Sequence, residues 1–206
     1  IVAGKLVGNE CADSAMLESI RATASRVAMD FIACLPELRR VLHTDVKAIF
    51  RGDPAATSTA EVTYCYPCIK AIINYRIAHE LLVAGVPVIP RMITEYAHSE
   101  TGIDIHPGAT IGEYFAIDHG TGVVIGETAI IGKNVKLYQG VTLGARSFPT
   151  DENDNLIKGI PRHPIIGDNV VIYSNATILG RISIGDNAVV GGNIWVTADV
   201  ASGERL

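Results

Sequence analysis

The sequence predicts an α+β protein, in which an N-terminal α-helical domain is followed by a left-handed parallel β-helix. Three observations lead to this prediction. Between residues 103 and 200 an aliphatic residue recurs every six positions, a repeat known from parallel β-helices. Before residue 100 the apolar residues instead follow a period of about 3.6, which is typical of amphipathic helices. The six-residue repeat has one long interruption, which predicts a loop extruded from the coil.

The helical domain is predicted over residues 1–100. Its apolar residues form helical stripes such as Leu17, Ile20 and Ala24, and Pro36 is expected to end the first helix. Glycine and proline mark the later boundaries. We expect this domain to cover the open end of the β-helix, whose strand edges would otherwise be unpaired. The pattern predicts helices at 13–35, 37–50, 67–85 and 91–99, with 55–61 as a linker.

The β-helix is predicted over residues 101–206. Three six-residue units, or hexads, make one turn, and successive turns stack ~4.8 Å apart. Each aliphatic anchor points into a narrow interior, and the fourth residue after it, mostly small or β-branched, lies at a corner. The thirteen anchors are Ile105, Ile111, Ile117, Ile125, Ile131, Leu137, Leu143, Ile166, Ile172, Ile178, Ile184, Val190 and Val196.

Two departures from the repeat are candidates for function. Leu143 and Ile166 are 23 positions apart instead of six, so a loop of about 17 extra residues is expected at 145–164. A long polar loop inside a compact repeat is more often functional than idle. Two extra residues at Val123-Val124 come shortly after Asp118-His119, which predicts a distorted corner there.

Composition and charge argue against several classes of partner. The 206-residue chain has a net charge of −5 and no Lys/Arg cluster longer than a pair, which disfavours nucleic acid and anionic membrane surfaces. No apolar stretch reaches membrane-spanning length and no signal peptide is recognised, so a cytoplasmic location is expected. Cys65 and Cys68 have redox-type spacing. Without a βαβ context or a second pair, we interpret them as ordinary thiols at a helix start.

The stacking of hexads places one histidine in a candidate groove. A histidine below small residues suggests a groove for an extended ligand. Asp118 adjoins this histidine and Asp104 lies about one coil back, and a carboxylate partner orients a histidine for general-base work. The plainer alternative is a corner histidine bonded to a backbone carbonyl. The column of equivalent positions is His119, Gln139, Ser174 and Gly192.

Several motifs resemble those of the serine O-acetyltransferases, a family of hexapeptide-repeat acyltransferases. The resemblance covers about residues 40–200 and extends into the helical domain. In the repeat its motifs are Asp104-Ile105-His106-Pro107, Asp118-His119-x-Thr121-Gly122, Ile125-Gly126-Glu127-Thr128-Ala129, Gly140-Val141-Thr142-Leu143-Gly144 and Arg162-His163-Pro164. In the helical domain they are Asp45-Val46-x-Ala48, Asp53-Pro54-Ala55 and Tyr75-Arg76-x-Ala78-His79.

The resemblance implies transfer of an acetyl group from acetyl-CoA to the hydroxyl of L-serine, which gives O-acetyl-L-serine for cysteine biosynthesis. By position, His119 would be the general base and Asp104 the carboxylate that orients it. Asp53 and Asp118 would hold the serine ammonium. No Ser or Cys stands out as the nucleophile of a covalent intermediate, so direct attack by the substrate hydroxyl is the simpler chemistry.

The other implied contacts lie on the loop and along the column. Arg162 and His163 would meet the serine carboxylate or the developing oxyanion, because an amino acid needs cations at one end and an anion at the other. Acetyl-CoA is the implied co-substrate, and no metal is expected. The pantetheine arm would lie along positions of little side-chain bulk: Gly144, Ala145, Ser174 and Gly192.

Assembly and partners also follow from the resemblance and the repeat. His163 lies between the first and second faces and His119 on the third, so within one prism they should be far apart. We therefore expect an active site shared between subunits of a homotrimer, alone or as a dimer of trimers. L-cysteine is the expected feedback inhibitor. O-acetylserine sulfhydrylase binds relatives through a tail ending in Ile, and the ending Gly203-Glu204-Arg205-Leu206 leaves that partnership open.

Three other functions are open on the sequence. Another hexapeptide O- or N-acetyltransferase would keep the groove but lack the combination of Asp53 with Arg162 and His163. A γ-class carbonic anhydrase would need three zinc-binding histidines, and the predicted β-helix has no closely spaced histidine pair. A non-enzymatic assembly scaffold would leave His119 idle.

Overall fold

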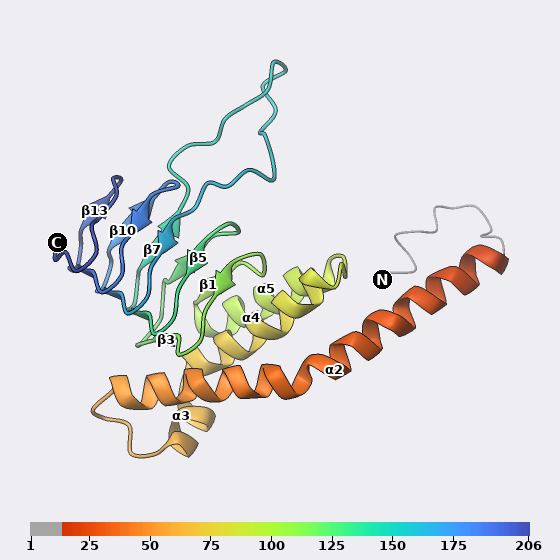
Figure 1. Cartoon of the computed structure of the whole chain (residues 1–206), viewed down its shortest axis with the longest axis horizontal. Coiled ribbons are helices and arrows are strands. Elements are labelled where there is room, and N and C mark those ends of the chain that lie inside the picture. The colour runs from red at the N-terminus through yellow and green to blue at the C-terminus, as the bar shows by residue number, and fades with distance from the viewer. Residues whose placement is uncertain (1–13) are drawn as a thin grey trace.

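Helices fill the first half of the described chain and short parallel strands fill the second (Figure 1). The structure is a computed structural model, and it describes residues 14–206. Within these residues no helix combines the length and the apolar character that crossing a membrane requires. The helices are α2 (Ser14–Gly52), α3 (Thr59–Cys65), α4 (Pro67–Val83) and α5 (Ile89–Thr101).

Helix α2 differs from the prediction, because it continues through Pro36. The sequence predicts two helices here, whereas the structure has one helix of 39 residues with Pro36 inside it. A proline removes one backbone hydrogen bond and bends or breaks a helix. Leu38 and Val46 are buried beyond the proline, and this packing keeps the second half helical. Figure 1 shows the resulting bend partway along α2. Asp13, the predicted first residue, lies outside the described residues.

Helix α3 occupies part of the segment predicted as a linker. Ser58 caps it, because its side-chain oxygen accepts a hydrogen bond from the N–H of Glu61 at 3.1 Å. The Glu61 carboxylate in turn accepts from the N–H of Thr57 at 2.6 Å. Ser58-Thr59-Ala60-Glu61 is a capping-box pattern, the signal from which this helix could be predicted. Helices α4 and α5 confirm the two later predicted helices to within two residues at each end.

Thirteen short strands form the β-helix, and each contains one predicted anchor. All thirteen anchors are at most 8 % exposed, which confirms the predicted register. The strands pair in parallel into three sheets, the faces of a prism. Sheet A contains β1 (Asp104–Ile105), β4 (Val124–Ile125), β7 (Thr142–Gly144), β10 (Thr177–Leu179) and β13 (Trp195–Val196). Sheet B contains β2 (Thr110–Ile111), β5 (Ile130–Ile131), β8 (Ile165–Ile166) and β11 (Ser183–Ile184). Sheet C contains β3 (Ala116–Ile117), β6 (Lys136–Leu137), β9 (Val171–Ile172) and β12 (Val189–Val190).

Left-handed backbone conformations turn many corners of the prism. Most of these residues are asparagine or glycine, which tolerate a positive φ. After β3 the two extra residues add a second left-handed turn, with φ of 58° at His119 and 100° at Gly120. The distorted corner predicted here is confirmed. Thr121 is the fourth residue after the anchor Ile117 and is therefore expected at the corner of the interior. Instead Thr121 is exposed, and Val123 fills the interior there.

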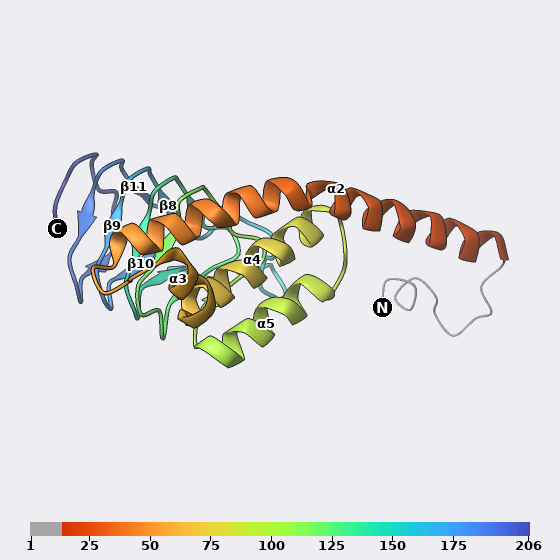
Figure 2. The same cartoon turned by 90° about the horizontal axis from the view of Figure 1, so that it is seen from below.

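A buried ion pair joins the helices to the first coil. Arg76 Nε donates to Asp45 Oδ2 at 2.6 Å, and the N–H of Phe115 donates to Asp45 Oδ1 at 3.0 Å. Arg76 also donates to the carbonyls of Ile111 and Gly112. Both charges are buried and well bonded, so removing one partner would leave an uncompensated charge. Figure 2 shows α2, α4 and α5 side by side next to the coils that this pair secures.

The two parts of the described chain share one core. Buried residues of α2 and α4 pack continuously with the anchors of the β-helix. The chain passes from helix to strand between Thr101 and Asp104. The predicted division into two domains, 1–100 and 101–206, is not visible as a gap in this core and stays a prediction.

One long segment leaves the prism between β7 and β8, at the predicted loop of residues 145–164. In Figure 1 it projects well away from the coils. An antiparallel bridge between Thr150 and Leu156 closes its tip. The segment returns to the prism at Arg162 and His163, so its far end delivers two of the predicted site residues.

Candidate active site

His119 lies on the turn between β3 and β4, where the chain passes from sheet C to sheet A. Its φ is 58° and its side chain is 75 % exposed. A positive φ is uncommon for histidine and often marks a position under functional constraint. Among residues 14–206 the ring makes no hydrogen bond, which argues against a corner histidine bonded to a backbone carbonyl. The turn therefore presents a free imidazole to solvent.

Asp118 is the carboxylate that approaches this ring. Its Oδ1 lies 3.8 Å from Nε2 of His119, while its Oδ2 lies 2.9 Å from the ammonium of Lys136. The Asp118 side chain is only 19 % exposed. Stacking of hexads explains the ion pair, because Asp118 follows the anchor Ile117 and Lys136 precedes the anchor Leu137 in the next coil.

Asp53, the residue directly after α2, lies close to Lys136 and His119. Its Oδ2 accepts from the Tyr66 hydroxyl at 2.5 Å and its Oδ1 accepts from the N–H of Ala55 at 2.8 Å. These bonds lower the pKa of Asp53, with smaller contributions from Lys136 and His119. The same carboxylate raises the pKa of Tyr66 to about 12, so the phenol stays a donor. We call this group the acidic corner: Asp53, Asp118 and His119, with Tyr66 and Lys136.

The second candidate histidine lies beside the turn that follows β4, where the chain passes from sheet A to sheet B. His163 is 7 % exposed, and its Nδ1 accepts from the N–H of Thr128 at 3.0 Å. Burial, helped by the Arg162 guanidinium, lowers the pKa of His163 to about 4. Near neutral pH the ring is therefore uncharged, with its proton on Nε2. The ring is thus neutral rather than the cation that the sequence predicts, and its contact with a substrate stays a prediction.

Polar neighbours hold His163 in this orientation. The Thr128 hydroxyl oxygen accepts from the backbone N–H groups of Arg162 and His163, at 2.9 and 3.1 Å. Arg162 Nη2 pairs with Glu127 Oε2 at 2.6 Å, and this pairing lowers the pKa of Glu127. Arg181 donates to the Thr128 carbonyl at 2.7 Å. We call this group the basic corner: Arg162, His163 and Arg181, with Glu127 and Thr128.

Asp104 is not brought into contact with His119. It begins β1 and pairs with Val124. Among the described residues no hydrogen bond or ion pair joins it to His119, whose one carboxylate neighbour within 4 Å is Asp118. Burial lowers the pKa of His106, and the nearby charge of Asp104 partly opposes this effect. The role of Asp104 as the orienting carboxylate stays a prediction.

The four residues predicted along a pantetheine arm lie at the two ends of the sheet A strands. Gly144 is the last residue of β7, with Ala145 after it, whereas Ser174 and Gly192 lie on the turns that lead into β10 and β13. Backbone hydrogen bonds align Gln139, Ser174 and Gly192 as predicted, but they align Thr121 with Gln139, so His119 lies outside the predicted column. Gln139 of that column has a buried side-chain oxygen without a hydrogen-bond partner among the described residues. Contact of this column with a ligand stays a prediction.

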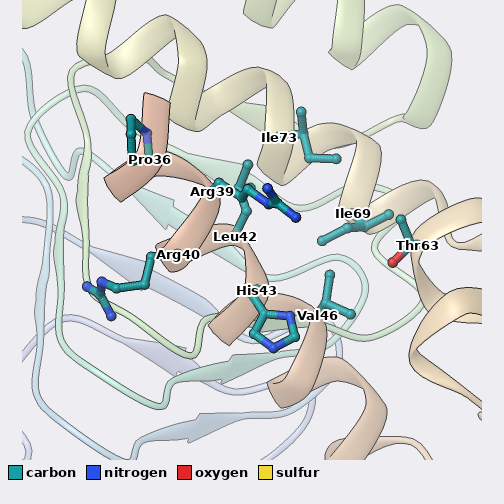
Figure 3. A pocket seen from close by; sticks show the side chains of 9 residues that line it. All are labelled: Pro36, Arg39, Arg40, Leu42, His43, Val46, Thr63, Ile69 and Ile73. Atoms are coloured by element: carbon teal, nitrogen blue, oxygen red, sulfur yellow. The ribbon is translucent and has the colours of Figure 1, made fainter. Parts of the chain in front are cut away.

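The acidic and basic corners lie at opposite ends of strand β4, as far apart as one face of the prism is wide. Among residues 14–206 no hydrogen bond or ion pair joins them. A cavity of about 660 Å³ opens elsewhere, among α2, α3 and α4, with Arg39 and His43 one turn apart on its wall (Figure 3). None of the predicted site residues lines this cavity. Within one chain the candidate site is therefore two separate groups on the surface.

The cysteines of the described part of the chain, and its possible metal ligands, lie apart from one another. In residues 14–206 no three His, Cys, Asp or Glu side chains gather as a metal site would require. Cys65 is exposed and Cys68 is buried, and neither forms a disulfide. Burial raises the pKa of Cys68 to about 12, which leaves it an unreactive thiol. Both fit the interpretation as ordinary thiols.

Sequence reasoning missed the residues that support the predicted ones. Thr128 and Glu127 belong to a motif that carries the resemblance, but no pattern assigns them to His163 and Arg162, each 35 residues from its partner. Tyr66 and Lys136 approach the acidic corner from two further elements. Their stacking position could have indicated Lys136, since it precedes an anchor one coil after Asp118.

The chain resembles known serine acetyltransferases along most of its length. A family model described as bacterial transferase hexapeptide (six repeats) matches residues 163–193. The chain is 56 % identical over 183 residues to "Serine acetyltransferase, plasmid" of Synechococcus elongatus, which covers 89 % of this chain and 57 % of that protein. It is 45 % identical over 161 residues to the serine acetyltransferase of Staphylococcus epidermidis, covering 78 % of this chain and 71 % of the relative. The chain thus spans little more than half of the first relative's length.

Solved structures of serine acetyltransferases have the same fold. Entamoeba histolytica serine acetyltransferase 1 in complex with L-cysteine superposes with a TM-score of 0.86 at 44 % identity, over 94 % of this chain and 72 % of that one. The Neisseria gonorrhoeae serine acetyltransferase in complex with serine gives 0.77 at 32 % identity, over 94 % and 75 %. These matches confirm the predicted fold class of helices followed by a left-handed β-helix.

Proposed function

Because the chain belongs to the serine acetyltransferase family, we propose that it transfers the acetyl group of acetyl-CoA to the hydroxyl of L-serine, releasing CoA. The observation that carries the proposal is the acidic corner, where the exposed imidazole of His119 lies 3.8 Å from Asp118 and close enough to Asp53 to lower its pKa slightly. A base for the hydroxyl and anions for the ammonium are what an amino-alcohol acceptor needs. The product would be O-acetyl-L-serine, an activated serine suited to cysteine biosynthesis.

His119 is the general base of this reaction. It takes the proton of the serine hydroxyl while the hydroxyl oxygen forms a bond to the thioester carbonyl carbon. When the tetrahedral intermediate collapses, the carbon–sulfur bond breaks and the imidazolium returns the proton to the departing thiolate. Asp118, 3.8 Å from Nε2, stabilises the imidazolium in between. The exposed position of His119 allows both substrates to reach it.

The ammonium group of serine binds at the acidic corner, and its carboxylate binds at the basic corner. Asp53 and Asp118 hold the ammonium, and the lowered pKa of Asp53 supports an ionised carboxylate at neutral pH. Arg162 binds the serine carboxylate, with Glu127 keeping its guanidinium in place. His163 donates its Nε2 proton to the developing oxyanion. A neutral donor suits that task, because it stabilises negative charge without taking up a proton itself.

A homotrimer completes the site. The corners of one chain lie at opposite ends of a prism face, so one acceptor molecule cannot touch both. Around a threefold axis, the acidic corner of one subunit would face the basic corner of the next. Acetyl-CoA would enter between subunits along Gly144, Ala145, Ser174 and Gly192. A cytoplasmic location and binding of L-cysteine at the serine site belong to the same proposal, and the L-cysteine complex of the Entamoeba relative supports the latter.

The test is release of CoA thiol from acetyl-CoA by this chain, with L-serine, L-threonine, an amino sugar or no acceptor. We expect L-serine to give at least roughly tenfold more release than any other acceptor, and mass spectrometry to identify O-acetyl-L-serine. Faster release with the amino sugar would indicate a different hexapeptide acetyltransferase. Release no faster than the acceptor-free rate for every acceptor would favour an assembly scaffold.

A further inference from the structure

Lys136 lies where the end of α2 meets the second coil, and its ammonium is held from three sides. It donates to the carbonyl of Gly52 at 2.6 Å, lies 2.9 Å from Asp118 Oδ2, and packs 4.5 Å from the centre of the Tyr138 ring. Its side chain is only 17 % exposed. We propose that Lys136 is a positioning residue that fixes the distance between Asp53 and Asp118, and thereby makes the site selective for acceptors that carry an ammonium group.

Lys136 connects the helical part of the chain to the β-helix. Asp53 belongs to the helical part and Asp118 to the β-helix, so nothing in the repeat itself fixes their separation. Gly52 immediately precedes Asp53, so the carbonyl that Lys136 binds is one peptide from the carboxylate in question. A single side chain therefore couples both acids.

The positive charge of Lys136 also suits its position. Lys136 lies beside the last carbonyls of α2, where the helix dipole favours a cation, and next to a carboxylate that is mostly buried. Its ammonium offsets the repulsion between two acids brought into one corner. It also binds one oxygen of Asp118, which leaves the other oxygen facing His119. With the acids fixed in this way, an acceptor ammonium finds both carboxylates already in place.

The inference rests on the proposed function and adds a specificity role to it. An acceptor without an ammonium binds to neither acid, so its KM should not depend on the spacing of the two carboxylates. Losing Lys136 should therefore weaken serine binding selectively. Damage to the fold would instead affect both acceptors and acetyl-CoA alike.

The experiment compares Lys136→Met, which keeps the aliphatic stem, with Lys136→Arg, which keeps the charge. Lys133→Met is the matched control, because Lys133 is an exposed lysine of the same coil whose side chain makes no hydrogen bond or ion pair within the described residues. For each variant, KM and kcat are measured for L-serine, for its ammonium-free analogue 3-hydroxypropanoate and for acetyl-CoA, together with Tm.

For Lys136→Met we expect KM for L-serine to rise at least roughly tenfold, while kcat and KM for acetyl-CoA change less than about threefold. The preference for L-serine over 3-hydroxypropanoate should fall by a similar factor. Lys136→Arg should recover most of that preference, and Lys133→Met should match wild type.

An unchanged serine preference in Lys136→Met, alongside active wild type, would overturn the inference and leave the proposed function standing. Equal losses for both acceptors and for acetyl-CoA, with a lowered Tm, would also overturn it by showing a structural role. Absence of serine acetylation by wild type would refute the proposed function and this role with it.

Discussion

The acidic and basic corners each contain a histidine, but the two histidines have opposite surroundings. His119 projects from a left-handed turn into solvent, without a hydrogen bond to its ring in the described part of the chain. His163 lies at the end of the long loop, buried, bonded through Nδ1 to Thr128 and uncharged near neutral pH. The difference shows how one side-chain type serves two tasks. Exposure beside a carboxylate suits a group that gains and loses a proton, whereas burial suits one that must keep its proton.

The largest expected effect is the loss of activity when the proposed general base, His119, is removed. Asparagine tolerates a positive φ and occupies several other left-handed corners of this β-helix, so His119→Asn keeps the turn and removes the base. We expect kcat for serine acetylation to fall at least about 10²-fold, with Tm unchanged within experimental error. His98→Asn, on the exposed surface of α5, is the control and should match wild type. A loss under threefold would show that His119 is not the base.

The next effect tests whether His163 acts as a neutral donor. Glutamine can accept from the Thr128 N–H and still donate a proton, whereas leucine can do neither. We expect kcat/KM to fall about 10²-fold in His163→Leu and only about tenfold in His163→Gln. Steady-state kinetics of both variants provide the measurement. If glutamine is as damaging as leucine, His163 exchanges protons and the contrast between the corners fails.

Removing one supporting bond should have a smaller effect, confined to the acidic corner. Tyr66→Phe takes away the hydroxyl that donates to Asp53 at 2.5 Å while leaving the ring. KM for L-serine should rise roughly three- to tenfold, since one charge-assisted hydrogen bond orients that carboxylate. Tyr64→Phe, an exposed neighbour on α3, is the matched control. A rise in KM for acetyl-CoA of the same size would place Tyr66 outside the serine site.

The smallest effect concerns stability and belongs to the basic corner. The pKa of His163 is about 4 in the folded chain, below its ordinary value of 6.5, so between these values the unfolded chain binds more protons. The stability that His163 contributes is complete above pH 6.5 and is lost as pH falls towards 4. His163→Gln should therefore show a flatter decline of unfolding free energy than wild type in denaturant titrations from pH 7 to 4. Parallel declines would mean that His163 titrates normally.

The β-helix could be predicted almost entirely from the sequence, because each anchor is dictated by one simple requirement. An aliphatic side chain must fill a narrow interior every six residues, and all thirteen anchors do so. The helical part was less predictable. Pro36 is a strong local signal, yet burial of Leu38 and Val46 beyond it overrides that signal. Tertiary packing of this kind is not written in the local pattern.

The residues of the candidate site likewise fall into those that the sequence indicates and those that only the structure reveals. The sequence predicts the distorted corner that carries Asp118 and His119, because the repeat is interrupted there. It does not indicate the charge state of His163, which depends on burial under a loop whose path the repeat leaves undefined. Tyr66 and Lys136 are equally hidden, since each reaches the acidic corner from an element distant in the chain. Residues that hold other residues in place are recognised only from contacts.

The most direct test of the account is complementation between two inactive chains. His119→Asn and His163→Leu are unfolded together, mixed in equal amounts and refolded, and serine acetylation is compared with that of each variant refolded alone. If every site combines the acidic corner of one subunit with the basic corner of the next, about a quarter of the sites in random trimers carry both intact histidines. The account predicts that activity returns to roughly that fraction of wild type. Activity no higher than that of the separate variants would place both corners of each site in one chain and contradict it.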